Sequence, residues 1–277
     1  MLKDAYIQCR DALTSGGIEN ADFEARCMIE HLTGYGRAAQ LAHGDEPFEK
    51  QRELEEMTAR RLQHEPLQYI LGKWSFCGFD FAVGDGVLIP RDDTEVALGL
   101  CLDYLRGKKG ASAIDLCSGS GAIAVALAKL TDCHMTALEL SEKASYFLKK
   151  NIELNQAAVT PIKSDVMSCF LDFKDDIFDL IVSNPPYIKS ADLPTLQKEV
   201  QFEPSLALDG GESGFDFYEA ILCNWTQKLR HGGAMVFELG ENQAAYVAAL
   251  MRKQGFENIR TELDFGGTER AIIGIRQ

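Results

Sequence analysis

Residues 113–130 read Ala-Ile-Asp-Leu-Cys-Ser-Gly-Ser-Gly-Ala-Ile-Ala-Val-Ala-Leu-Ala-Lys-Leu, and this stretch decides the fold. Its first four residues are a short, mostly apolar run, which predicts a buried strand. Residues 123–130 are rich in alanine and predict a helix, and a glycine-rich turn joins the two. A strand that passes through such a turn into a helix is the first half of a β-α-β unit.

The same alternation of strands and helices extends over residues 85–277. Further strands are predicted at residues 135–140, 177–182, 235–237 and 271–275, and helices at residues 144–152, 217–225 and around 250–251. Alternating strands and helices predict a parallel sheet with helices on both faces, so we expect a doubly wound α/β domain.

The residues before this domain have a different pattern. Ala25, Met28, Ile29 and Leu32 follow the spacing of one buried helix face, and Gly34 is placed to end that helix. Aromatic and polar residues then alternate on both sides of Cys77-Gly78, which predicts a β-hairpin. We therefore expect a small helical domain over residues 1–73, a hairpin connector over residues 74–84 and the α/β domain over residues 85–277.

The composition is that of an ordinary globular protein, with 46% hydrophobic and 25% charged residues. No apolar run is long enough to span a bilayer, and the first residues have no signal-peptide core, so we expect a cytoplasmic protein without a membrane partner. The eight cysteines never form a C-x-x-C pair and the five histidines do not cluster. We therefore expect no metal site and no disulfide framework.

The formal net charge of −14 bears on possible partners. Tight binding to nucleic acid normally needs a basic surface that displaces phosphate counterions. An acidic chain can still carry a local basic patch, but the balance favours a small molecule or a basic protein surface. We expect no direct nucleic-acid partner.

The glycine-rich turn is suited to a nucleoside ligand. Glycines let the backbone approach a ligand closely, and the helix that follows offers free N–H groups. Glu139 ends the next predicted strand, where a carboxylate can accept hydrogen bonds from both ribose hydroxyls. A purely structural turn is the alternative reading, and the pairing with Glu139 favours the ligand.

The residues near this turn also indicate which nucleoside it suits. The P-loop sequence is absent, and Asp115 just before the turn would repel a phosphate. The same carboxylate suits the cationic sulfonium and amino group of S-adenosylmethionine. Asp165, between the strands predicted at residues 135–140 and 177–182, can accept from an adenine amino group or, alternatively, serve as a turn or cap residue.

The strongest signal is Asn184-Pro185-Pro186-Tyr187, which follows the apolar run at residues 180–182. Prolines cannot continue a strand ladder, so the chain leaves the sheet at the edge where ligands bind in open α/β folds. The Asn184 side chain and the Pro185 carbonyl form two acceptors that match an NH₂ group on a planar carbon. The Tyr187 ring can stack on that plane. A rigid strand-ending turn is the structural alternative.

This loop resembles the motif of amino-methyltransferases, and the α/β domain resembles the Rossmann-like class I methyltransferase fold. Residues 88–95, Leu-Ile-Pro-Arg-Asp-Asp-Thr-Glu, are similar to the I-P-R-P-D-T-E segment of the peptide-chain release factor N5-glutamine methyltransferases, the HemK or PrmC family. Residues 65–72, 202–208 and 233–240 also resemble this family. The resemblance covers the chain from about residue 20 to its end.

The resemblance implies a transferase that uses S-adenosyl-L-methionine and yields S-adenosyl-L-homocysteine. Its implied substrate is the glutamine of the Gly-Gly-Gln motif in class I peptide-chain release factors, the proteins of translation termination. The family pattern places the cofactor against Cys117, Ser118, Gly119, Ser120, Gly121, Glu139, Asp165, Val166 and Asn184. The catalytic residues would be Asn184, Pro185 and Tyr187, and the substrate would bind Asn184, Pro185, Pro186 and Tyr187.

Two residues depart from the family pattern. Cys117 stands where the family usually has the first glycine of the turn, and Asp92 stands where it usually has proline. Because a cysteine fits a glycine position comfortably only at negative φ, we expect negative φ at Cys117. Val166 lies where the family often has an aromatic residue, so we expect weaker stacking on adenine.

Two other functions are compatible with the same loop. A nucleic-acid methyltransferase acting on adenine N6 or guanine N2 would present a similar NH₂ group, but it needs a basic cleft and usually flips the base out of its stack. A module that only binds S-adenosylmethionine would not need the intact Asn-Pro-Pro-Tyr loop. Both are less compatible with the sequence than the methylation of a protein glutamine.

Overall fold

The computed structural model describes all 277 residues, which form two compact units. The first unit comprises Met1–Gly72 and Gln197–Phe202, and the second comprises Lys73–Leu196 and Glu203–Gln277. No helix in the chain is both long and apolar enough to span a bilayer.

The first unit is helical. Its elements are α1 (Leu2–Ser15), α2 (Ala21–Thr33), α3 (Arg37–Ala42), α4 (Gln51–Leu62), α5 (Leu67–Leu71) and the 3-10 turn η3 (Val200–Phe202). The helix predicted around Met28 is confirmed, and it ends at Gly34, whose φ of 75° is the left-handed cap that glycine favours. Arg61 is buried and ties the unit together, because it donates to Glu24 (2.6 Å) and to Glu199 (3.0 Å).

The second unit begins with the predicted hairpin, which the structure confirms. Strands β1 (Lys73–Phe76) and β2 (Phe79–Ala82) pair in antiparallel fashion. Cys77 and Gly78 have φ values of 49° and 79°, as a tight two-residue hairpin turn requires.

A seven-stranded sheet forms the centre of this unit, in the order β5-β4-β3-β6-β7-β9-β8. The first five strands in that order are parallel, and β9 and β8 are antiparallel to their neighbours. The strands are β3 (Ser112–Leu116), β4 (His134–Glu139), β5 (Val159–Lys163), β6 (Phe178–Ser183), β7 (Leu229–Glu238), β8 (Phe256–Leu263) and β9 (Glu269–Arg276).

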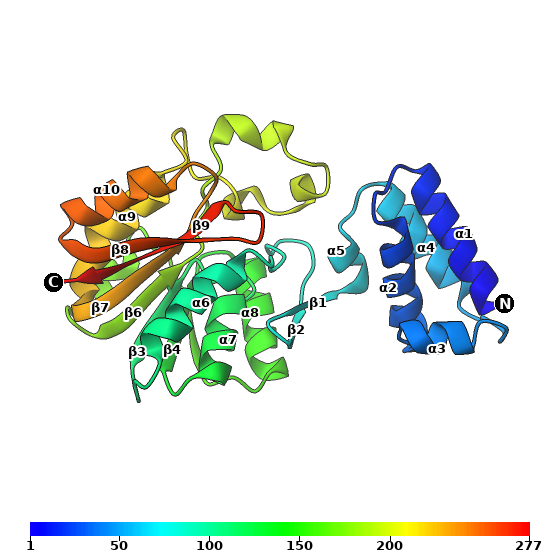
Figure 1. The fold of residues 1–277 in the computed structure, drawn as a ribbon, viewed down its shortest axis with the longest axis horizontal. Coiled ribbons are helices and arrows are strands. Elements are labelled where there is room, and N and C mark those ends of the chain that lie inside the picture. The colour runs from blue at the N-terminus through cyan, green and yellow to red at the C-terminus, as the bar shows by residue number, and fades with distance from the viewer. The chain divides into compact units, whose positions relative to one another are not determined.

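Helices cover both faces of the sheet, as the alternating pattern predicted. Figure 1 shows α6 (Thr94–Leu105), α7 (Ala122–Leu130) and α8 (Glu142–Leu154) on one face, and α9 (Asp216–Trp225) and α10 (Ala244–Lys253) on the other. Short 3-10 turns complete the connections: η1 (Cys169–Asp172), η2 (Ser190–Thr195), η4 (Ser205–Ala207) and η5 (Thr226–Lys228). The architecture is the doubly wound α/β fold expected from the sequence.

Several details differ from the sequence predictions. Helix α6 and strands β5 and β8 were not among the predicted elements. Strand β7 was expected to start after Gly233, but it begins at Leu229. Gly232, with φ of 77°, lies inside this strand near a register shift against β6, so the glycines mark a bulge and not the loop before the strand.

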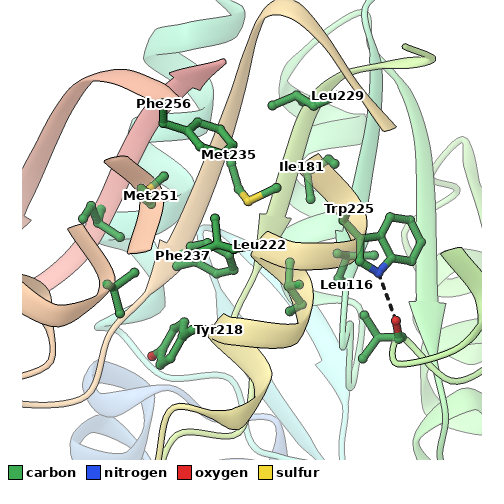
Figure 2. Packing of buried hydrophobic residues seen from close by; sticks show 14 of the residues in the cluster. Leu116, Ile181, Tyr218, Leu222, Trp225, Leu229, Met235, Phe237, Met251 and Phe256 are labelled. Carbon is green, nitrogen blue, oxygen red and sulfur yellow. Dashed lines mark hydrogen bonds between the residues drawn. The ribbon is translucent and has the colours of Figure 1, made fainter. Parts of the chain in front are cut away.

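The face covered by α9 and α10 holds a continuous apolar core, drawn in Figure 2. Trp225, fully buried on α9, donates its indole N–H to the carbonyl oxygen of Val166 at 2.9 Å. The core therefore fixes the backbone at one end of the ligand cavity that is described next.

Candidate active site

The carboxyl ends of β3, β4, β5 and β6 surround a cavity of about 230 Å³. Its lining residues come from the loops that follow these strands and from two further loops: Gly86, Val87, Leu88, Cys117, Gly119, Leu138, Glu139, Leu140, Ser141, Ala144, Ser164, Asp165, Val166, Met167, Asn184, Pro186, Pro204, Leu206, Ala207 and Phe217. The mixture of apolar walls and a few carboxylates and backbone groups suits a nucleoside.

The glycine-rich turn forms one wall and is held by backbone hydrogen bonds. Ser118 N donates to Leu138 O on the neighbouring strand (2.9 Å), and Gly121 N donates to Ser118 O (2.8 Å). The expectation of negative φ at Cys117 is wrong, because Cys117 has φ of 62°. A non-glycine residue in this left-handed region costs roughly 1 kcal/mol or more, so the turn carries local backbone strain beside the cavity.

Glu139 lies at the end of β4 and is buried. Its Oε2 accepts from Gly119 N and its Oε1 from Ser141 N, both at 2.8 Å, so the carboxylate joins the turn to the start of α8. Burial raises the pKa of Glu139, and these backbone N–H groups partly offset that effect. The remaining lone pairs of the carboxylate are available at the cavity wall.

A smaller cavity of about 40 Å³ lies on the other side of the turn and shares Leu88, Cys117, Gly119 and Asn184 with the first. Asp115 lines it, and both carboxylate oxygens of Asp115 are buried without a hydrogen-bond partner. Burial raises the pKa of Asp115 to about 8. An orphaned acid in a small cavity that adjoins the larger one indicates that a cationic or hydrogen-bond-donating group of a ligand belongs there.

The predicted pair Asp165 and Val166 lines one end of the larger cavity. Asp165 Oδ1 accepts from Met167 N at 2.8 Å, so the carboxylate is fixed by its own turn. Val166 is buried and presents an apolar side chain, next to the backbone that Trp225 holds. This end can accept the edge and one face of a flat heterocycle.

Asn184 stands where the two cavities meet. Its Nδ2 donates to Thr94 Oγ1 at 3.4 Å, and Thr94 is buried at the start of α6. The side-chain oxygen of Asn184 is thereby left as an acceptor for a ligand in the cavity. The prediction that the chain leaves the carboxyl edge of the sheet at Asn184 is confirmed, and Asn184 lines the smaller cavity together with residues of the glycine-rich turn.

Pro186 also lines the larger cavity, whereas Pro185 and Tyr187 are not among its lining residues. Tyr187 is closely enclosed. A Cβ atom on Gly210 would come within 2.7 Å of the Tyr187 Cα, and one on Gly240 within 2.9 Å of the Tyr187 ring. Any larger residue at these two positions would have to displace the loop.

Two hydrogen bonds hold Tyr187 inside this enclosure. Gln243 Nε2 donates to its carbonyl oxygen (3.0 Å), and its own hydroxyl donates to Glu238 Oε1 (3.4 Å). Burial, and then the charge of Glu238, raise the pKa of Tyr187, so its hydroxyl remains a donor.

Glu203 holds together two segments that line the cavities, residues 86–91 and residues 203–207. This buried carboxylate accepts from Ile89 N at 3.0 Å and forms an ion pair with Arg91. Residues 86–91 and 203–207, distant in sequence, therefore meet at one wall of the cavities. Asp92, the second departure from the family pattern, is exposed in the turn before α6.

The structure thus gathers Glu139, Asp165, Val166, Asn184, Pro186 and, from the turn, Cys117 and Gly119 around one cavity. Ser118 and Ser120 line the smaller cavity, and Gly121 lines neither. Sequence reasoning did not assign roles to Thr94, Glu203 or Glu238. All three lie in segments that resemble the family, residues 88–95, 202–208 and 233–240, and this was the only signal for them.

Comparison with known proteins identifies the class of protein to which this site belongs. The family model described as the PrmC N-terminal domain matches residues 4–72, and the methyltransferase small domain matches residues 91–201. Among solved structures, the hMettl16 catalytic domain has a TM-score of 0.60 at 17% identity, over 80% of this chain and 82% of that one. A methyltransferase from Pyrococcus furiosus has a TM-score of 0.53 at 19% identity, over 80% of this chain and 98% of that one.

The fold is that of the class I methyltransferases, and the match to the methyltransferase small domain makes the chain a methyltransferase of this class. A release factor glutamine methyltransferase of Geobacter sulfurreducens is 41% identical, over 96% of this chain and 93% of that protein. A release factor glutamine methyltransferase of Bordetella pertussis is 36% identical, over 96% of this chain and 98% of that protein. The chain belongs to the release factor glutamine methyltransferase family.

Proposed function

We propose that this enzyme transfers a methyl group from S-adenosyl-L-methionine to N5 of the glutamine in the Gly-Gly-Gln motif of class I release factors. The observation that carries the proposal is the arrangement at Asn184. Its amide donates to Thr94 on one side and leaves Oδ1 as an acceptor where the two cavities meet.

The residues present fit S-adenosyl-L-methionine, which supplies an activated methyl group on a sulfonium when it is bound. Glu139 would accept from the ribose hydroxyls, and Asp165 and Val166 would hold the adenine. Asp115, orphaned in the smaller cavity, would accept from the amino group, beside the backbone of Ser118 and Gly119. S-adenosyl-L-homocysteine would leave the same site as the product.

The assignment of Asp115 makes a pH-dependent prediction. In the cofactor-free enzyme its pKa of about 8 exceeds the ordinary value of 3.8, so the folded protein binds a proton that the unfolded chain releases. The stability that Asp115 contributes is therefore fully present below about pH 4 and is lost as the pH rises to about 8. Asp115→Asn should remove this decline in melting temperature and should weaken cofactor binding about tenfold or more, through loss of a charged hydrogen bond. Thermal melts at several pH values and titration calorimetry measure the two effects. Unchanged affinity would exclude Asp115 from the site.

The chain's own residues can prepare a glutamine amide for methylation. Its nitrogen is a poor nucleophile because the lone pair is delocalised into the carbonyl. The Asn184 side-chain oxygen and the Pro185 carbonyl would accept its two N–H groups, orienting the nitrogen and stabilising the positive charge that grows on it. The enclosed Tyr187 ring would hold the amide plane. Loss of the proton follows the transfer, and no covalent bond to the enzyme is needed.

The charges around the cavities favour a protein substrate over nucleic acid. Asp115, Glu139 and Asp165 line the cavities, and Arg91, the cation beside them, is paired with Glu203. The residues that line the cavities therefore offer a phosphate backbone no unpaired cation. The eight free cysteines are the state expected in the reducing cytoplasm, where we place the reaction.

Selectivity must come from more than the amide, since every glutamine side chain is chemically alike. We therefore propose that the helical unit docks the folded release factor, while the slim Gly-Gly-Gln tip enters the cavity. Steady-state assays with labelled cofactor should give high kcat/KM on the intact release factor and poor activity on free glutamine or a short Gly-Gly-Gln peptide. Efficient labelling of DNA or RNA instead would support the nucleic-acid alternative. Cofactor binding without transfer to any substrate would support a binding module.

A further inference from the structure

Glu238 lies beneath the Asn-Pro-Pro-Tyr loop and is not used by the mechanism above. It is the last residue of β7, next to the end of β6, where Ser183 pairs with Phe237. Its side chain is 1% exposed, and its Oε2 has no hydrogen-bond partner. A buried carboxylate that is only partly satisfied is costly, so its presence here calls for a role.

Two groups of the site interact with this carboxylate. The Tyr187 hydroxyl donates to Oε1 at 3.4 Å. The Thr94 hydroxyl, which accepts from Asn184, also stabilises the charged form of Glu238 by hydrogen bonding. Glu238 is therefore connected to the acceptor residue Asn184 through one intermediate and to the stacking residue Tyr187 directly.

The direction of these hydrogen bonds matters for the reaction. The Thr94 hydroxyl has a single proton. If that proton is directed to Glu238, its oxygen must serve as an acceptor, and only the NH₂ side of the Asn184 amide can face it. If the proton were free, Thr94 could donate to the Asn184 oxygen instead. The amide would then turn its NH₂ toward the substrate NH₂, which is repulsive.

We propose that Glu238 is a positioning residue that sets the orientation of the Asn184 amide through Thr94, and that it also holds the Tyr187 ring. The inference rests on the proposed function, because it concerns the amide acceptor of that reaction. Ionised Glu238 accepts from both hydroxyls and makes Asn184 present its oxygen. Protonated Glu238 becomes a donor and no longer fixes that direction.

The ionisation of Glu238 falls in a useful range. Burial raises its pKa to about 7, while hydrogen bonds from Thr94 and Tyr187 and the charge of Arg270 oppose the increase, and Asp93 adds to it. Arg270 is itself paired with Asp264 (3.0 Å) and lies near Asp93 (3.4 Å), and the buried Tyr218 hydroxyl donates to the Glu238 carbonyl at 2.9 Å. The competent, charged form of Glu238 is thus present above about pH 7 and is lost below it.

The test is the variant Glu238→Gln, with kcat measured as a function of pH. The cofactor is kept at saturation, so that Asp115, which titrates in the cofactor-free enzyme, does not contribute to the pH dependence. Glutamine keeps the shape of Glu238 but adds a donor. We expect kcat to fall about tenfold or more, the cost of a misoriented catalytic group, with cofactor affinity within about twofold. Wild type should lose kcat below about pH 7, and the variant should lack that dependence. The exposed Glu262→Gln on β8 is the matched control.

Thr94→Val tests independently whether the Thr94 hydroxyl links Glu238 to Asn184. Thr94→Ser keeps the hydroxyl, so it should recover most of the kcat that Thr94→Val loses. If Glu238 acts through Thr94, the double variant should be little worse than the poorer single variant. Wild-type kcat in Glu238→Gln at every pH, or losses that multiply in the double variant, would overturn the proposal. If Glu238→Gln does not fold, full activity of Thr94→Val would still refute it. An inactive wild-type enzyme on release factor would instead contradict the proposed function.

Discussion

Replacing Asn184 with alanine is expected to lower kcat by about 100-fold or more, with cofactor affinity within about twofold of wild type. The alanine variant loses the acceptor where the two cavities meet, and the substrate amide then lacks one of the two groups that orient its nitrogen. Because one contact among many to the cofactor is lost, binding should change little.

Single-turnover rates and titration calorimetry separate the two effects. Asn224→Ala, half-buried on α9, is a suitable control for the loss of an asparagine side chain. Near wild-type turnover in Asn184→Ala would remove this residue from the mechanism. A large loss of cofactor affinity with unchanged kcat would assign it to cofactor binding alone.

Glu139→Ala is expected to weaken cofactor binding by about 1.5–3 kcal/mol, which is roughly 10- to 150-fold in Kd. The charged hydrogen bonds to the ribose would be lost, and Gly119 N and Ser141 N would lose the carboxylate that fixes the turn. The turn is already strained at Cys117, so it has little tolerance for losing this support.

Titration calorimetry measures the change in affinity, and Glu142→Ala provides the control. Glu142 is an exposed carboxylate at the start of α8, paired with Lys163, and its removal should leave affinity unaltered. A melting curve for Glu139→Ala distinguishes lost contacts from lost folding. Wild-type affinity in a folded Glu139→Ala protein would mean that the ribose lies elsewhere.

Local patterns in the sequence were sufficient for most of the fold. The alternation of strands and helices, the Cys77-Gly78 hairpin and the helix ended by Gly34 all follow from spacing and turn chemistry, and each is confirmed. Ser141 caps α8 in the same local way, because its side chain accepts from Ala144 N. These features depend on neighbours in the chain, which is why they could be predicted.

The errors have physical causes that lie outside the local sequence. The strand predicted at residues 235–237 starts at Leu229, because Gly232 forms a bulge inside the strand, and local sequence does not distinguish such a glycine from one in a preceding loop. Cys117 was expected at negative φ, yet the backbone bonds of Ser118 and Gly121 fix the turn and override the residue's preference. Tertiary hydrogen bonds decided both cases.

The candidate site could be predicted only in part for a related reason. The turn, Glu139 and Asn184 are found at strand ends, where the topology must bring them together. Thr94 lies 90 positions before Asn184 in the chain, and Glu238 lies 54 positions after it. No spacing rule of a helix or strand links residues so far apart. Their contribution becomes visible only when the start of α6 and the end of β7 both lie beside the end of β6.

The measurement that tests the proposed reaction most directly is the mass of an intact class I release factor after incubation with the enzyme and S-adenosyl-L-methionine. We predict the addition of a single methyl group, which fragmentation should locate on the side-chain nitrogen of the glutamine in Gly-Gly-Gln, and no addition with Asn184→Ala at matched times. A release factor that stays unmodified while DNA or RNA gains the methyl group would contradict this function, as would a methyl group on any other residue.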